Sequence, residues 1–125
     1  RALQNLPIEI FGTGERTRDF TYIDDVVRAN VLAMKCNGGV YNIGSGERIS
    51  IKSLAERIIR QTNSRSRIVF REDAPGDAQH TWANTDSAGE GLGWRSEVDI
   101  NTGLRRYLKW LTGCDFGRLD DRADD

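Results

Sequence analysis

The chain has 125 residues, of which 38% are hydrophobic and 30% charged, a balance typical of one globular domain and too apolar for wholesale disorder. Its formal net charge of -1 gives no electrostatic reason to expect nucleic acid or an anionic membrane as a partner. Cys36, Cys114 and the single histidine, His80, show no metal-ligand spacing, and no signal peptide or membrane-spanning apolar run is visible. We therefore expect no metal site, no membrane association and a cytoplasmic location.

The chain does not begin with methionine, and residues 1–6 read like the last turns of a helix that Pro7 stops. These features lead us to expect a piece of a longer protein. Residues 8–11 contain β-branched and aromatic side chains and predict a short strand. A glycine-containing loop follows, and residues 19–23 predict a second extended stretch.

A helix is predicted from residue 26 to about residue 35, with Asp24 or Asp25 as its N-cap. A carboxylate at that place also suits the positive end of the helix dipole. Asn37 and the two glycines after it are a typical helix end. Apolar residues surround nearly the whole circumference of this helix, and we therefore predict that it is largely buried.

A strand–helix–strand unit is predicted next, with residues 40–43 as its first strand and residues 68–70 as its second. Ser50 is the expected N-cap of the helix between them, which runs to about Thr62. Its apolar residues recur at i, i+3, i+4, i+7 and i+8, the pattern of one helix face. Two strands joined in this way are expected to be parallel, with a right-handed crossover.

Beyond the second strand the pattern loosens. A turn at residues 73–77 precedes a short extended piece at 81–83, and a brief helix begins near residue 85. One face of a final amphipathic helix is apolar: Ile100, Leu104, Tyr107, Leu108 and Leu111. The chain is therefore predicted to be an α/β domain with short strands and three to four helices over residues 1–114, followed by a disordered acidic tail at 115–125.

Gly44 and Gly46 follow a predicted strand and precede a predicted helix, as in a dinucleotide-binding fingerprint. Ile49 stands where the third glycine of that pattern belongs, and Ser50 already caps the helix. A tight turn that needs positive φ is therefore favoured over a cofactor site.

Two arginines, Arg16 and Arg18, lie one residue apart in a loop that begins with Gly12. Their guanidinium groups can grip a diphosphate, although a solvated loop with surface ion pairs explains them equally well. Asp77 ends a Pro-Gly-Asp sequence, which favours a reverse turn; the alternative is a carboxylate that accepts from ribose hydroxyls.

No residue is assigned a catalytic role. None of the three tyrosines has a lysine four residues later, and no Ser/His/Asp order surrounds His80 convincingly. The adjacent carboxylates Asp24 and Asp25 are explained by helix capping.

Six segments follow one another in a characteristic order and spacing between Pro7 and about Trp110. They are Pro-Ile-Glu-Ile-Phe-Gly at 7–12, Gly-Glu-Arg-Thr-Arg-Asp-Phe-Thr-Tyr-Ile-Asp-Asp-Val-Val at 14–27, Tyr-Asn-Ile-Gly-Ser-Gly at 41–46, Pro-Gly-Asp at 75–77, Thr-Trp-Ala-Asn at 81–84 and Leu-Gly-Trp at 92–94. Together they resemble the NAD-dependent epimerase/dehydratase family, the extended short-chain dehydrogenases, and within it the UDP-sugar 4-epimerases.

This resemblance implies that residues 1–114 are the small C-terminal domain that closes over a nucleotide sugar. The N-terminal Rossmann domain of such enzymes, which binds NAD and carries a Tyr-x-x-x-Lys pair, is then missing from this chain. In the family, the segment matching Ile10 and Phe11 bonds the uracil through its main chain. The arginine matching Arg18 contacts the phosphate–ribose region, and the aspartate matching Asp77 contacts the ribose. The substrate is accordingly expected to be UDP-linked, and the intact enzyme a homodimer.

Two residues depart from the family pattern. Many members have arginine at the place of Ala74, where it meets the diphosphate, and Arg71 is a candidate substitute. Glutamine is frequent at the place of Arg16.

The leading hypothesis is the substrate-binding part of an NAD-dependent nucleotide-sugar 4-epimerase, of the UDP-glucose, UDP-glucuronate or UDP-N-acetylhexosamine type. Such an enzyme inverts C4 through a 4-keto intermediate, and the chain as given is expected to be inactive. Phe20 favours the epimerases over the dTDP-glucose dehydratases, which prefer tryptophan there, and Asp19 favours them over the decarboxylases, which more often have serine. The alternatives are a dehydratase or decarboxylase of the same family, or a non-catalytic nucleotide-binding or interaction module.

Overall fold

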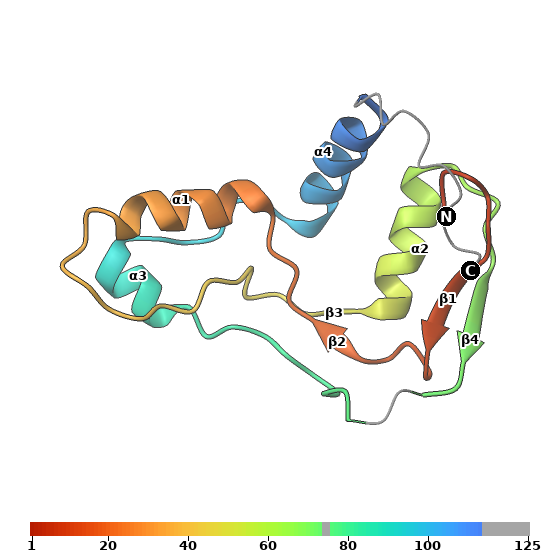
Figure 1. The fold of residues 1–125 in the computed structure, drawn as a ribbon, viewed down its shortest axis with the longest axis horizontal. Coiled ribbons are helices and arrows are strands. Elements are labelled where there is room, and N and C mark those ends of the chain that lie inside the picture. Colours follow the sequence, from red (N-terminus) through yellow and green to blue (C-terminus); the bar gives the residue numbers. More distant parts are fainter. Residues whose placement is uncertain (74–75, 114–125) are drawn as a thin grey trace, which may run out of the picture.

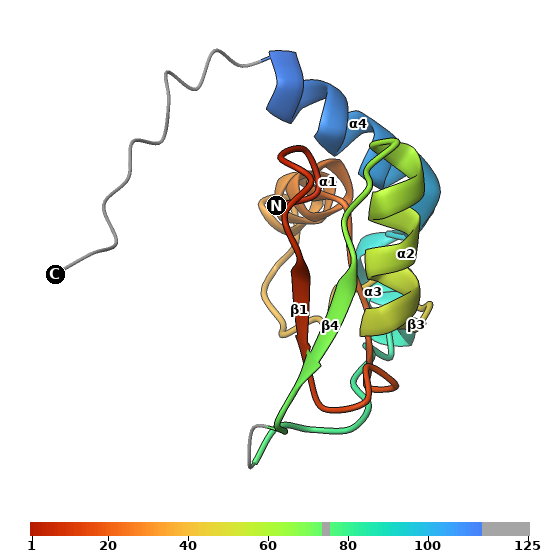
Figure 2. The same cartoon turned by 90° about the vertical axis from the view of Figure 1, so that its right-hand side faces the viewer.

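The computed structural model describes residues 1–73 and 76–113, which form two lobes joined by a thin middle strip (Figure 1). The first lobe holds two parallel strands, β1 (Ile8–Phe11) and β4 (Ile68–Arg71), and helix α2 (Ile51–Gln61). Helix α2 lies along one side of the strand pair, as the turned view shows (Figure 2).

The second lobe holds the helices α1 (Ile23–Ala33) and α3 (Asp86–Leu92). Two short antiparallel strands, β2 (Thr17–Arg18) and β3 (Ile49–Ser50), cross the middle of the molecule. Helix α4 (Ile100–Gly113) rises from the middle and contacts α2. The α/β prediction with short strands and up to four helices is thus confirmed for the part of the chain that the structure describes.

The partner of β4 differs from the prediction. The predicted strands at 8–11 and 68–70 are present and pair with each other in parallel, from Ile8 opposite Ile68 to Phe11 opposite Arg71. Residues 40–43, predicted as the first strand of a strand–helix–strand unit, form no strand, and Val40 is 96% exposed. That prediction was wrong because a strand needs a partner, and β1 occupies the place beside β4.

The predicted helix after Ser50 is confirmed, including its cap. The Ser50 hydroxyl accepts a hydrogen bond from the Ser53 amide at 3.1 Å, and the helix ends before Asn63, whose φ is 51°. The Ser64 amide then donates back to the Ile59 carbonyl at 3.0 Å, a bond that closes the last turn. Ala55 is the fully buried residue of the helix.

Residues 1–6 have the hydrogen bonds that close a helix, as predicted. The Leu6 amide donates to the Arg1 carbonyl at 2.9 Å and the Asn5 amide to the Ala2 carbonyl at 3.1 Å, with Asn5 at a φ of 57°. These are the two bonds of a Schellman motif. The chain then enters β1 directly after Pro7.

The predicted cap of α1 was wrong. The helix begins at Ile23, its N-cap is Tyr22, and no side chain caps it; Asp24 and Asp25 lie inside the first turn. Asp25 is only 1% exposed because its carboxylate is enclosed between Arg28 of its own helix and a distant segment that it binds. It accepts hydrogen bonds from the Ser96 hydroxyl at 2.9 Å and the Val98 amide at 3.0 Å.

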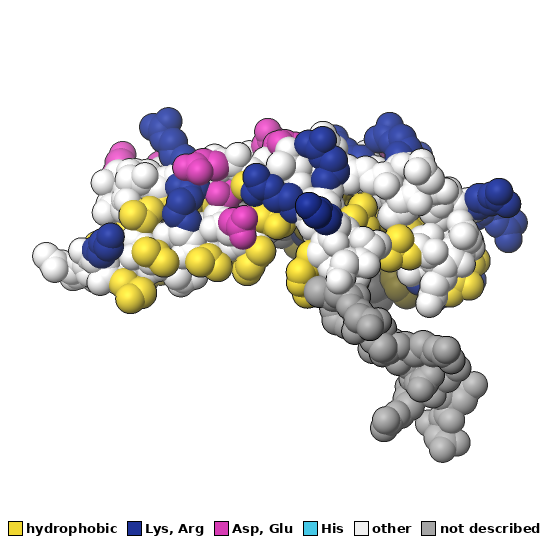
Figure 3. Space-filling model, turned by 90° about the horizontal axis from the view of Figure 1, so that it is seen from above, with side chains coloured by type: hydrophobic (Ala, Val, Ile, Leu, Met, Phe, Trp, Pro, Cys, Tyr) yellow, Lys and Arg dark blue, Asp and Glu magenta, His cyan; other side chains and the backbone are white. Residues whose placement is uncertain are grey.

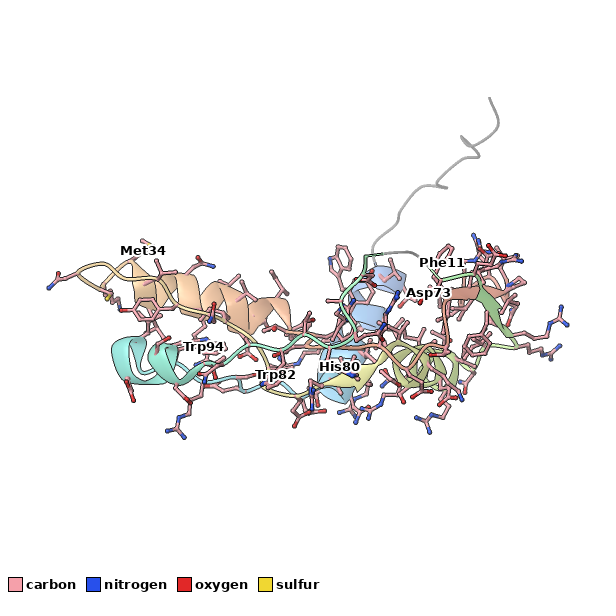
Figure 4. The ribbon with its side chains drawn as sticks, turned by 90° about the horizontal axis from the view of Figure 1, so that it is seen from below. Phe11, Met34, Asp73, His80, Trp82 and Trp94 are labelled. Atoms are coloured by element: carbon pink, nitrogen blue, oxygen red, sulfur yellow. The ribbon has the colours of Figure 1, made fainter. Side chains whose placement is uncertain are left out.

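The core of the second lobe lies between α1 and α3, where Ala29, Ala88 and Trp94 are buried. The Trp94 indole donates to the Asp25 carbonyl at 2.9 Å, so this core and the Asp25 carboxylate fix the same turn of α1. Figure 4 shows Trp94 within this lobe.

The prediction that α1 is largely buried was wrong. Only Asp25 and Ala29 are buried, and four apolar side chains along one face of the helix are exposed: Ile23, Val27, Val31 and Met34. We call these four residues the α1 stripe. Figure 3 shows hydrophobic side chains in a row along this lobe, and Figure 4 shows Met34 at its far end.

The extended stretch predicted at 19–23 was misplaced, because the strand there is β2 at Thr17–Arg18 and Ile23 already begins α1, whereas the last two helices agree with their predictions. Helix α3 follows Thr85 and ends at Gly93, and α4 carries the final apolar pattern, with Gly103 buried against the Tyr22 ring. None of the helices in the described ranges is long and apolar enough to span a bilayer. The tail predicted at 115–125 lies outside the described residues.

Candidate functional site

The carboxyl ends of β1 and β4 meet at one edge of the strand pair. Phe11 lies opposite Arg71, and the Gly12 amide still donates to the Arg71 carbonyl at 3.0 Å before the two chains part. Figure 4 shows Phe11 and Asp73 at this edge. Ligands of α/β folds commonly bind just beyond the carboxyl ends of parallel strands, so this edge is a candidate ligand-binding edge.

Strand β2 brings the arginine loop against the segment that follows β4. The Thr17 amide donates to the Gln79 carbonyl at 3.0 Å, and the Thr81 amide donates to the Thr17 carbonyl at 3.2 Å. The Thr17 hydroxyl and the His80 Nδ1 lie 2.9 Å apart and strengthen the same junction. Since side chains alternate along an extended chain, Arg16 and Arg18 point to the side opposite Thr17.

Both arginines are held by carboxylates of the segment after β4. Arg18 Nη2 lies 2.6 Å from Asp77 Oδ1, and Arg16 Nη1 lies 3.2 Å from Asp77 Oδ2. The second Arg16 nitrogen, Nη2, lies 2.6 Å from Asp73 Oδ1. Asp77 thus bridges the two guanidinium groups, and Asp73 holds Arg16 from the other side. We call these four residues the arginine–carboxylate cluster.

The arginines of the cluster are sheltered and its carboxylates are open. The side chains of Arg16 and Arg18 are 11% and 22% exposed, whereas those of Asp73 and Asp77 are about half exposed. Arg18 Nη1 also donates to its neighbour's carbonyl, that of Thr17, at 2.9 Å. Two positioned guanidinium groups can each give a pair of hydrogen bonds to phosphate, so the cluster is chemically suited to a diphosphate.

The loop that carries the cluster requires glycine at two positions. Gly12 and Gly14 have φ of 76° and 79°, where other residues are strained. A Cβ at Gly14 would lie 2.9 Å from the Lys52 Cβ, and one at Gly12 would lie 3.0 Å from Asp73 Oδ1. The loop therefore packs tightly against both α2 and Asp73.

The four residues predicted to bind substrate all lie on this side of the molecule. Arg18 and Asp77, far apart in sequence, are in direct contact, while Ile10 and Phe11 lead into the arginine loop from β1. The Ile10 side chain is buried in the first lobe and the Phe11 side chain is exposed. Asp73 was not singled out from the sequence, because only the fold shows that it faces Arg16.

Arg71 is engaged away from the cluster. Its Nη2 lies 2.5 Å from Glu9 Oε1, a pair across the β1–β4 ladder. The hydrogen bond and the charge of Arg71 hold the pKa of the Glu9 carboxyl below its ordinary value. Arg16, whose guanidinium meets both carboxylates of the cluster, is therefore a better candidate than Arg71 for the diphosphate contact that many family members make with an arginine at the place of Ala74. Ala74 itself lies outside the described residues.

The glycine turn at 44–46 is filled by a carboxylate of the same chain. Asp19 accepts from the Ser45 amide at 2.7 Å and from the Gly46 amide at 3.1 Å. Burial would raise the pKa of Asp19, but the bonds from Ser45, Gly46 and Ala83 outweigh it and hold that pKa below the ordinary value. Because the turn's amides already bind an anion, the structure supports a tight turn here and offers no place for a dinucleotide phosphate.

The described residues contain no group of three or more His, Cys, Asp or Glu side chains that could hold a metal ion.

Two tyrosines have side-chain partners. The guanidinium of Arg106 lies over the Tyr22 ring, and Tyr41 shares a hydrogen bond of 3.2 Å with Cys36. That bond, together with burial, raises the pKa of Tyr41 above its ordinary value.

Comparison with known proteins gives consistent matches. The sequence model of the family described as GDP-mannose 4,6 dehydratase matches residues 2–107. The UDP-glucuronate 4-epimerase of Thermodesulfobacterium geofontis is 36% identical over 106 residues, which make up 83% of this chain and 33% of that protein. The chain spans about a third of the length of the curated relatives that it matches.

Two solved structures show the same fold. The UDP-glucose 4-epimerase of Thermotoga maritima, solved with UDP-glucose, superposes with a TM-score of 0.86 at 33% identity over 90% of this chain and 37% of that one. The UDP-glucuronic acid 4-epimerase of Bacillus cereus, in complex with UDP-glucuronic acid and NAD, gives 0.78 at 34% identity over 87% of this chain and 37% of that one.

Proposed function

The chain belongs to the GDP-mannose 4,6-dehydratase family of nucleotide-sugar epimerases and dehydratases, and from this membership we propose that it is the nucleotide-sugar-binding part of an NAD-dependent UDP-sugar 4-epimerase. The arginine–carboxylate cluster carries the proposal. It places two sheltered guanidinium groups beyond the carboxyl ends of β1 and β4, beside an aspartate that can turn to ribose hydroxyls.

Each substrate-binding residue has a proposed role. Arg18 and Arg16 donate hydrogen bonds to the two phosphates of the UDP group. Asp77, once the phosphates replace it on Arg18, accepts from the ribose hydroxyls. The main chain of Ile10 and Phe11, at the end of β1, lies along the uracil. These contacts bind and orient the nucleotide, which fixes where the sugar lies.

The reaction itself requires groups that the described residues do not supply. The residues of the arginine–carboxylate cluster would hold the nucleotide and so orient the sugar, and NAD, when bound, would supply reversible hydride transfer at C4, with the 4-hydroxyl proton passing to and from a base; return of hydride to the other face would invert that carbon. The glycine turn at 44–46 does not fit a dinucleotide, because Asp19 already binds its amides. We therefore assign NAD binding and proton transfer to a further domain of the same protein, against which the α1 stripe would pack.

The test uses the complete gene product supplied with NAD. It is incubated with UDP-glucose, UDP-glucuronate and UDP-N-acetylglucosamine in turn, and the products are followed by proton NMR. The expected product has an inverted C4 and an unchanged mass. If all three sugars remain unepimerised, the epimerase assignment is wrong.

The same measurement separates the rivals. A dehydratase, which the family's description favours, would give a 4-keto-6-deoxy sugar lighter by one water, and a decarboxylase would release carbon dioxide from the glucuronate alone. A non-catalytic module would bind UDP in calorimetry and leave every sugar unchanged.

A further inference from the structure

The arginine–carboxylate cluster is neutral before any ligand arrives. Arg16 and Arg18 contribute two positive charges, and Asp73 and Asp77 contribute two negative charges at 2.6 to 3.2 Å. A diphosphate that takes the Nη donors of Arg16, or Nη2 of Arg18, displaces the carboxylate oxygens that already occupy them. The two aspartates then remain close to an added pair of negative charges, which costs binding free energy.

The two aspartates differ in what they gain after that exchange. Asp77 has a new partner in the proposed function, because ribose hydroxyls can donate to it. Asp73 has no second ion pair within the described ranges: its carboxylate contacts Arg16 and lies against Gly12. Displaced from Arg16, it becomes an unpaired negative charge beside the phosphates.

This inference rests on the proposed function: we propose that Asp73 is an affinity-determining residue that competes with the nucleotide diphosphate for Arg16. In the empty site it holds the guanidinium of Arg16, whose side chain is 11% exposed. It also weakens the binding of every anionic ligand that takes this arginine. Ligands that also engage Asp77 through a ribose offset this loss, whereas a bare phosphate or pyrophosphate does not.

The decisive variant is Asp73→Asn in the complete gene product, with UDP as the probe in calorimetry. Asparagine keeps the size of the side chain and its contact with Gly12 but removes the charge. We expect UDP to bind about two- to fivefold more tightly, the range for one partly exposed ion pair. This gain should shrink at high salt.

The neighbouring Glu72 provides a matched control. Glu72 is exposed, lies one residue earlier and forms no ion pair within the described ranges, so Glu72→Gln removes the same charge without touching Arg16. It should leave the Kd for UDP unchanged. In the Arg16→Gln background, the gain from Asp73→Asn should be smaller, because the competition for that guanidinium is gone and only the repulsion between Asp73 and the phosphates remains.

Three results would overturn the inference while leaving the proposed function intact. They are UDP binding by the wild type that Asp73→Asn leaves unchanged or weakens, an equal gain in Glu72→Gln, and an undiminished gain in the Arg16→Gln background. If the wild type and all the variants fail to bind UDP, the proposed function itself is wrong and this inference falls with it.

Discussion

At the scale of single residues, Asp25 joins two parts of the chain that are distant in sequence. Its carboxylate accepts from the Ser96 hydroxyl and from the Glu97 and Val98 amides, and it pairs with Arg28 at 2.9 Å. Burial would raise the pKa of Asp25, but these donors outweigh it and hold that pKa below its ordinary value. The charged form is therefore the one that holds residues 96–98 against α1.

Asp25→Ala should destabilise the second lobe by about 2–4 kcal/mol, because several buried donors lose their acceptor. Asp25→Asn, which keeps one oxygen, should cost less. Hydrogen exchange of the amides at 97 and 98 in the intact protein measures the effect locally, and unchanged protection in Asp25→Ala would contradict it. Because the folded pKa is lowered, the contribution is present above the unfolded pKa of about 3.9 and is lost as the pH falls through the folded value. Asp25→Asn should flatten that acid dependence.

Arg18→Ala should weaken UDP-sugar binding by about 1.5–3 kcal/mol, the range for a charge-assisted hydrogen bond. Arg18→Lys should fall between, since lysine keeps the charge but loses the two-pronged geometry. Arg60→Ala, at the exposed end of α2, removes an arginine away from the site and should not alter the Kd. Calorimetry on the intact protein measures all three, and equal dissociation constants would remove Arg18 from the proposed site.

Residue patterns predicted Arg18 and Asp77 only through the family resemblance, because by chemistry alone a solvated loop and a reverse turn explained them. The Asp25 error has a similar origin. A carboxylate before a helix usually caps it, and nothing local indicates donors some seventy residues later. Asp73 was missed for the same reason, since its partner Arg16 is adjacent only in the fold.

At the scale of elements, helix α2 was predicted with its cap and its end because every signal for it is local. Ser50, the apolar spacing and the closing turn at Asn63 are all read within a short window. The strand predicted at 40–43 failed because its existence depends on a partner. Even the correct pairing of β1 with β4 could not be derived from sequence, which favoured neighbours along the chain.

Ser50→Ala should destabilise α2 by about 1 kcal/mol, because the Ser53 amide loses its acceptor at 3.1 Å. Ser50→Asp supplies another good capping oxygen and should retain most of the stability. Exchange rates of the first α2 amides report on the cap. Unchanged exchange in Ser50→Ala would mean that the hydroxyl does not act as a cap.

At the scale of the whole molecule, the α1 stripe is an apolar surface that no other described element covers. Periodicity showed that α1 is apolar nearly all round, and burial was the natural prediction. In the described structure Met34 is instead 84% exposed, and the nearby Val40 is almost fully exposed, without a strand partner. The chain spans about a third of its relatives' length, and we propose that the rest of that fold covers this exposed apolar face.

Val31→Asp tests this arrangement in the intact protein. If the α1 stripe packs against a further domain, the new carboxylate is buried without a partner, which costs at least about 2 kcal/mol and lowers the melting temperature. Ala33→Asp introduces the same charge two residues later on another exposed side of α1, and it should leave the melting temperature nearly unchanged. Limited proteolysis should likewise cut between the two parts faster in Val31→Asp alone. Equal melting temperatures for the two variants would show that the α1 stripe faces solvent in the complete protein, and the proposed docking of a cofactor-binding domain on this face would then be wrong.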